Sequence, residues 1–204
     1  MEVSSPPRRL PPAERREQLI DSALAIAAQQ GYENLAFEKV ANRAGVTRNL
    51  VYHYFPGGRQ ELLEAAVHLA GEQLSSGWVT DPKIPLGQRL EANLNRMMDH
   101  AEEPTDAWQL YRQGRGTVDP GLLEIARQYR ERVIGLIALN QLGTAEAPPV
   151  VRIALDGFMA YAETVIESAI EQEMPRAQVI ELVSGTLMST MNAAAGASAP
   201  GPQS

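Results

Sequence analysis

The chain of 204 residues carries a formal net charge of −7 and contains no cysteine, which excludes disulfides and thiolate chemistry. Its length allows a single domain or a small domain joined to a larger one. Aromatic residues make up only 5% of the chain, whereas alanine, leucine and glutamate are plentiful. Because this composition favours helices, we expect an all-α protein.

The first part of the chain predicts an unstructured arm followed by closely spaced helices. Residues 1–12 are rich in proline, serine and arginine and lack the apolar segment of a signal peptide, so we expect a disordered N-terminal arm. Its Arg8-Arg9 pair could reach a DNA minor groove, although a solvated tail is the commoner case. Apolar spacing, together with turns at Gly31 and Gly45, predicts helices over 13–30, about 37–43, about 47–54 and Arg59 to about 75.

The second part begins after residues 76–87, whose two prolines and two glycines predict a domain boundary. A helix from Leu86, a shorter one around Trp108 and a third over Pro120 to about Leu139 should follow, with Asp119 as the N-cap of the third. A loop is expected over 140–149. Residues 193–204 are expected to be disordered.

The last two predicted helices, about 150–171 and 176–191, are rich in apolar residues. The first is apolar around most of its circumference, so it must be covered on both faces. We expect the two helices to form a homodimer interface, as a four-helix contact between two chains.

The sequence offers little for a helical enzyme, a metal site or a membrane protein. It has no nucleophile motif, and the Gly57-Gly58 pair lacks the pattern of a phosphate-binding loop. His53 has no second ligand at metal spacing, and His68 and His100 are lone helical histidines that we expect to be solvated. The longest apolar run, 133–139, is far too short to span a bilayer. We therefore expect a cytoplasmic protein that is not an enzyme and has no metal, no cofactor and no membrane contact.

One window of the chain suits a polyanion. No aspartate or glutamate occurs between Lys39 and Gln60, although basic residues are frequent there. The two short helices that meet at Gly45 have the layout of a helix-turn-helix, over about 36–55. Val40, Ala41 and Ala44 would let the second helix cross closely, and its outward face would then carry Thr47, Arg48, Asn49, Tyr52 and His53. These side-chain types suit the phosphates and base edges of a duplex.

Residues 16–62 resemble the N-terminal domain of TetR-family transcriptional regulators. The matching residues are the spaced Leu19, Ile20 and Ala23, then "GYENL", "KVANRAGV" and "VYHYF", and finally Arg59 with "ELL". The resemblance implies two domains. Residues 13–75 would form an N-terminal three-helix DNA-binding domain that contains the helix-turn-helix, and residues 76–192 would form a larger C-terminal helical domain for ligand binding and dimerisation. It also implies a homodimer that binds a palindromic operator in double-stranded DNA and is released by a small-molecule effector.

The same resemblance assigns the outward residues of the second short helix to DNA reading. Tyr52 takes the place of a phosphate-contacting tyrosine, and Arg59 stands in for a lysine. The DNA-binding candidates are Thr47, Arg48, Asn49, Tyr52, His53, Arg59, Lys39 and Arg43. Three features depart from the family pattern: Leu35-Ala36 replaces a capping Thr/Ser pair, Asn49 replaces a common glycine, and the link "PGGRQ" is one residue longer.

Several C-terminal side chains could line an effector cavity, although at helical spacing each could also be plain core. The candidates are Trp108, Tyr111, Arg112, Tyr129, Phe158 and Met159. Arg112, with Arg115, could receive an acidic ligand or pair with acidic neighbours on the surface. Two alternatives stay open beside a repressor: a transcriptional activator of the same architecture, and a small-molecule-binding dimer that has lost DNA binding.

Overall fold

The computed structural model describes residues 10–115 and 120–198, with the backbone alone at Gly121, Leu122, Glu124, Ile125 and Ser198. Every regular element in these residues is helical, which confirms the predicted all-α class. The elements are α1 (Pro12–Gln30), the 3-10 turn η1 (Tyr32–Asn34), α2 (Phe37–Ala44), α3 (Arg48–Tyr54), α4 (Gly58–Ser75), α5 (Leu86–Glu102), α6 (Asp106–Arg115), α7 (Pro120–Leu142), α8 (Pro149–Glu171) and α9 (Arg176–Ser198). None of the described helices is long and apolar enough to cross a membrane.

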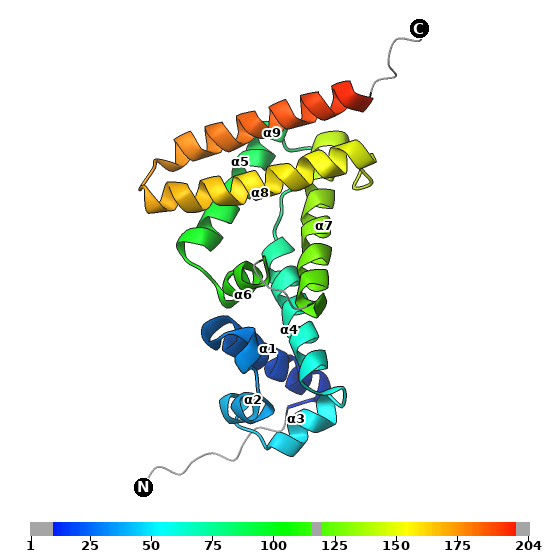
Figure 1. Cartoon of the computed structure of the whole chain (residues 1–204), viewed down its shortest axis with the longest axis vertical. Helices are drawn as coiled ribbons and strands as arrows, with labels where there is room; N and C mark the ends of the chain where they lie inside the picture. The colour runs from blue at the N-terminus through cyan, green and yellow to red at the C-terminus, as the bar shows by residue number, and fades with distance from the viewer. Residues whose placement is uncertain (1–9, 116–119, 199–204) are drawn as a thin grey trace.

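The helices form two groups at opposite ends of an elongated molecule. Figure 1 shows α1, α2 and α3 at one end and α8 and α9 side by side at the other, with α4, α6 and α7 between them. One hydrophobic core lies among α1 to α4 and also takes in Trp108, Leu110 and Tyr111 of α6. The other lies among α5, α7, α8 and α9. Helix α6 therefore follows the predicted boundary in sequence but packs against α1 and α4 in space.

Two helices extend further than expected at their C-terminal ends. Helix α7 continues to Leu142, so the start of the predicted 140–149 loop is helical. Helix α9 continues to Ser198 through "NAAAGAS", although we expected disorder from residue 193. Alanine has the highest helix propensity, and Ala194 is buried, so both local preference and packing extend this helix. Arg8-Arg9 of the predicted arm and Asp119 of the predicted cap lie outside the described residues.

The turn between α2 and α3 depends on Gly45. Its φ of 66° and ψ of 37° lie in the left-handed region, which glycine adopts without steric cost. The N–H of Val46 then donates to the carbonyl of Ala41 at 2.9 Å, closing the end of α2. Thr47 begins α3 as its N-cap, because its hydroxyl accepts from the N–H of Leu50 at 3.3 Å. Ala36, at the start of α2, supplies no side-chain cap.

Arg59 fastens α4 to the segment that leads into α2. Its Nε donates to the carbonyl of Leu35 at 3.0 Å, and its Nη2 donates to the carbonyl of Tyr32 at 2.6 Å. Leu35 is itself buried, so these bonds hold a fixed part of the core. Because the two carbonyls precede α2, the guanidinium sets where α2 starts relative to α4.

We expect Arg59→Gln to lower the free energy of unfolding by about 1–2 kcal/mol, because two carbonyls lose a charged donor. Arg43→Gln is the matched control, since Arg43 is exposed on α2 and its loss should cost less than about 0.5 kcal/mol. Urea unfolding of both variants, followed by circular dichroism, measures the difference. Equal midpoints for the two variants would contradict this structural role for Arg59.

Candidate nucleic-acid interface and ligand cavities

Helix α3 presents all of its predicted reading side chains to solvent. Thr47, Arg48, Asn49 and His53 are exposed, and Tyr52 is 45% exposed despite its size. The opposite side of this segment is anchored, since Val51 and Phe55 are fully buried. The burial pattern thus separates residues that hold the helix from residues that are free to meet another molecule.

Arg48 and Tyr52 are joined to Glu38 of α2. The Nη2 of Arg48 donates to the Tyr52 hydroxyl at 2.8 Å, and its Nη1 lies 2.5 Å from Oε1 of Glu38. The Tyr52 ring packs edge-on against Phe37, with their centroids 4.5 Å apart. The hydrogen bond with Tyr52, assisted by the charge of Glu38, raises the pKa of Arg48 above its usual value. The side chains of Arg48 and Tyr52 are therefore held in one orientation.

The acid-free window of the sequence is not acid-free in space. Glu38 lies one residue before the window, and the crossing of α2 and α3 brings its carboxylate to Arg48. Glu38 lies just outside the acid-free window, so the residues inside the window do not reveal it. The positive charge at the start of α3 is partly compensated as a result.

The remaining predicted cations differ in how they are placed. Lys39 is exposed, and its Nζ donates to Oε1 of Gln30 at 2.7 Å. Arg43 is exposed on the same helix. Arg59 directs two donors at backbone carbonyls inside the domain, which leaves it less free to meet a phosphate than a solvated cation would be.

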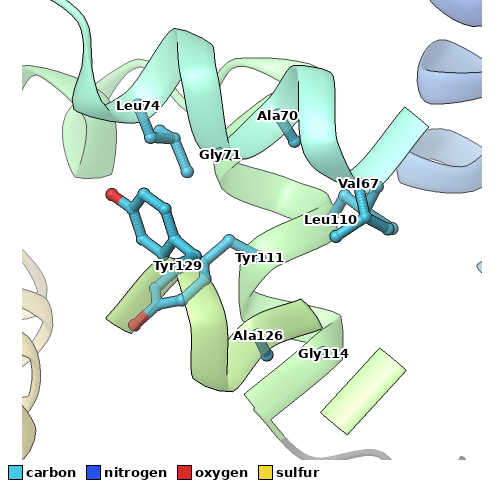
Figure 2. A pocket seen from close by; sticks show the side chains of 9 residues that line it. All are labelled: Val67, Ala70, Gly71, Leu74, Leu110, Tyr111, Gly114, Ala126 and Tyr129. Carbon is cyan, nitrogen blue, oxygen red and sulfur yellow. The ribbon is translucent and has the colours of Figure 1, made fainter. Parts of the chain in front are cut away.

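A cavity lies between α4, α6 and α7, and Figure 2 shows the side chains around it. It is narrow, with a cavity volume of about 20 Å³, and its walls are almost entirely apolar. The lining residues are Val67, Ala70, Gly71, Leu74, Leu110, Tyr111, Gly114, Ala126 and Tyr129. We call it the α4–α7 cavity.

A second cavity, also of about 20 Å³, adjoins the first through shared walls at Leu74, Tyr111 and Tyr129. We call it the α5–α8 cavity. It differs from the first because polar and charged side chains also reach it. Its lining residues are Leu74, Trp78, Arg96, Met97, His100, Trp108, Tyr111, Tyr129, Val133, Met159 and Glu163.

Most of the predicted ligand residues lie at these cavities. Trp108, Tyr111, Tyr129 and Met159 line the α5–α8 cavity. Phe158 lines a third, apolar cavity that reaches α9. Arg112 lies apart from all three, with its side chain half exposed and its Nε 3.3 Å from Oε1 of Glu167.

Glu163 is a buried carboxylate that the sequence did not reveal. It is 2% exposed; Tyr111 donates to its Oε1, and Arg115 donates to its Oε2 at 2.6 Å. Burial, and next the charge of Glu163, raises the pKa of Tyr111, so its phenol stays protonated as a donor. A polar connection thereby joins α6 to α8.

His100 was expected to be solvated, and that expectation is wrong. Its ring stacks on Trp108 with centroids 6.4 Å apart, and its Nε2 is buried without a hydrogen-bond partner. Burial lowers its pKa, which favours the neutral ring. Helical spacing could not separate a solvated histidine from one covered by a neighbouring helix.

Known proteins resemble the N-terminal part of the chain in sequence. The family model "Bacterial regulatory proteins, tetR family" matches residues 19–66, from within α1 to within α4. The HTH-type transcriptional repressor KstR of Mycolicibacterium smegmatis is 42% identical over 101 residues, which are 46% of this chain and 48% of KstR. The HTH-type transcriptional activator FasR of the same organism is 31% identical over 108 residues, 50% of this chain and 47% of FasR. The chain thus spans less than half the length of these two curated relatives.

A solved structure extends the resemblance to nearly the whole fold. The crystal structure of a tetR-family transcriptional regulator from Streptomyces coelicolor superposes with a TM-score of 0.72 and 26% sequence identity, covering 92% of this chain and 84% of that one. The helix-turn-helix, the family model and this superposition agree with one another. The N-terminal domain is thus that of a TetR-family transcriptional regulator, and the described chain has the fold of a solved member of that family.

Proposed function

We propose that this regulator is a ligand-responsive repressor that binds a palindromic operator through α3 and leaves it when a small molecule binds. The observation that carries the proposal is the outward face of α3, where five polar side chains stand exposed over a fully buried anchor. Arg48 and Asn49 are types that pair with base edges, whereas Thr47 and Tyr52 suit phosphate oxygens. Reading is assigned to residues 13–75, and ligand binding and dimerisation to residues 76–192.

A homodimer through α8 and α9 is supported by an exposed stripe of small and apolar residues. On α8 the stripe consists of Ile153, which is 75% exposed, followed by Gly157 and Ala160. On α9 it includes Leu182 and Gly185. Small residues let helices approach closely, so two copies can close a four-helix contact. The dimer would place its two α3 helices about 34–36 Å apart, one turn of the duplex.

Coupling between ligand and DNA is supported by the position of α6 and α7. Gln113 of α6 donates to the carbonyl of Ala28 in α1 at 2.8 Å, and Tyr129 of α7 lies against Gly71 of α4. A ligand that displaces α6 or α7 would tilt α4 and change the separation of the α3 helices. Since the operator fixes that separation, a small tilt costs DNA affinity.

Two alternatives to a repressor, an activator and a dimer that does not bind DNA, can each be tested by a direct measurement. FasR is named an activator, and an activator would use the same architecture. For a repressor, transcription from the DNA upstream of the gene that encodes this chain should fall when the protein is added to purified RNA polymerase. A rise in transcription would identify an activator. The second alternative, a dimer that has lost DNA binding, stays open because Ala36 supplies no cap and the link before Arg59 is longer than the family pattern. A steep fall of duplex affinity with rising salt would count against that alternative.

We expect Arg48→Ala and Tyr52→Ala each to weaken binding to the upstream region about tenfold or more, because each removes a base or phosphate contact. Gel shift at fixed salt measures the change. Arg152→Ala is the control, since Arg152 lies on α8 in an exposed ion pair with Glu131 and should leave affinity unchanged. Undiminished binding by both α3 variants would refute the assignment of α3.

We expect Glu38→Gln to tighten binding to unrelated duplexes by roughly 3- to 10-fold at low salt, because Arg48 loses a competing carboxylate. The ratio of operator to non-operator affinity should fall accordingly. Glu64→Gln, on α4, removes the same charge away from Arg48 and serves as the matched control. Equal gains in both variants would reduce the effect to net charge, and a loss of affinity in Glu38→Gln would contradict the competing role.

We expect Ile153→Glu to give a monomer that fails to retard the upstream region, because the substitution places a charge in the proposed helix contact. Sedimentation velocity measures the mass, and gel shift measures the binding. Gln88→Glu adds the same charge at an exposed site on α5 and should stay dimeric. A dimeric Ile153→Glu with normal DNA binding would place the interface elsewhere.

A further inference from the structure

We propose that the α5–α8 cavity takes an effector made of an apolar body and one acidic oxygen group, of which a carboxylate is the simplest. The inference rests on the proposed ligand-responsive function and adds the chemical class of the effector. It comes from the buried polar atoms of the cavity and from the apolar cavities on either side of it.

Three nitrogen atoms at this cavity are buried and have no hydrogen-bond partner: Nε of Arg96, Nε2 of His100 and Nε1 of Trp108. Trp108 is 5% exposed, so water from outside does not reach its indole. Indole and guanidinium N–H groups can only donate, and buried donors in folded proteins nearly always have acceptors. The cavity therefore lacks an acceptor, which an oxygen atom of a ligand would supply.

The charge of Arg96 favours an anion over a neutral acceptor. Within the described residues no carboxylate lies at ion-pair distance from Arg96, and its Nη2 donates only a long bond, 3.3 Å, to the carbonyl of Gln73. Arg115 and Arg176 nearby are each paired with carboxylates. Hydrogen bonds between a guanidinium and a carboxylate are stronger than those to a neutral oxygen.

Glu163, the acidic residue of the cavity, is not available for a cationic ligand. One of its oxygens accepts from Tyr111 and the other from Arg115, whose charge balances its own. A cation would have to compete with Arg115 for a carboxylate that is already hydrogen-bonded and buried. The cavity therefore has unpaired hydrogen-bond donors, and a ligand that supplies an acceptor fits it better than one that supplies a donor.

Apolar cavities of about 20 Å³ each lie on both sides of this polar centre, so the apolar part of the ligand would enter by pushing their walls apart. Leu74, Tyr111 and Tyr129 line both this cavity and the α4–α7 cavity, and Figure 2 shows the two tyrosine rings in the wall of the latter. Trp78 and Met97 are shared with the apolar cavity that reaches α9. An acid held by Arg96 and Trp108 would extend its body past the tyrosines and between α4 and α7, where it can shift α4.

The test uses the full chain and three probes with one skeleton: 4-phenylbutyrate, its methyl ester and 4-phenylbutylamine. Isothermal titration calorimetry should give the acid an affinity at least about tenfold above that of the ester and the amine, as expected for a charged hydrogen bond. Arg96→Gln should remove the preference for the acid over the ester, and Arg96→Lys should restore part of it. Trp108→Phe, which keeps an aromatic ring and loses only the N–H, should weaken both oxygen-bearing probes. Arg152→Gln, which removes an exposed charge on α8, should change nothing.

The outcomes separate this inference from the proposed function. Tighter binding of the amine, equal binding of acid and ester, or no heat from any probe at millimolar concentration would overturn it. So would a preference for the acid that survives Arg96→Gln. Gel shift with the same probes then tests the function on its own: if the acid binds as expected but the DNA complex persists, the effector class stands and ligand-responsive release fails. If the amine releases the DNA and the acid does not, release stands and the effector class fails.

Discussion

Tyr111 joins the two halves of the molecule. Its ring is buried in the core that α6 shares with α1 and α4, while its hydroxyl donates to Glu163 of α8. It also contacts Tyr129 of α7 in a T-shaped pair, with centroids 5.0 Å apart. Tyr111 thus contacts the N-terminal core as well as α7 and α8. A movement of one group of helices relative to the other would have to break these contacts. The position of α4, and hence of α3, depends on this junction.

At the α3 end of the molecule, contacts within the protein hold the side chains in place. Thr47 caps α3, Val51 and Phe55 anchor it, and Arg48 is held by Tyr52 and Glu38. A side chain already fixed in one orientation loses less conformational entropy on binding. In the proposed complex with DNA, the carboxylate of Glu38 would be displaced or shared by a phosphate, which would make weak, non-specific contacts less favourable than well-matched ones.

The helices and the exposed face of α3 could be predicted from sequence because both depend on local signals. Helical spacing, a glycine at the turn and the alternation of anchor and surface residues around Val51 carry that information. The Glu38–Arg48 pair, the inward turn of Arg59 and the burial of Glu163 and His100 could not be predicted in this way. Each depends on how helices distant in sequence pack against one another. Periodicity places a residue on one face of its helix but does not show which other helix covers that face. The end of α9 differs from the expected disorder for another reason, because the high helix propensity of alanine and the burial of Ala194 extend the helix to Ser198.

Gly71 determines how closely α7 approaches α4. A Cβ atom there would lie 3.3 Å from Cδ2 of Tyr129, closer than most real contacts of this kind. The two helices touch at this point because a side chain is missing, and no attractive contact is required to bring them together. The spacing of α4 and α7 therefore depends on the missing side chain of Gly71. A methyl group at this position, or a bound molecule beside it, would push the two helices apart.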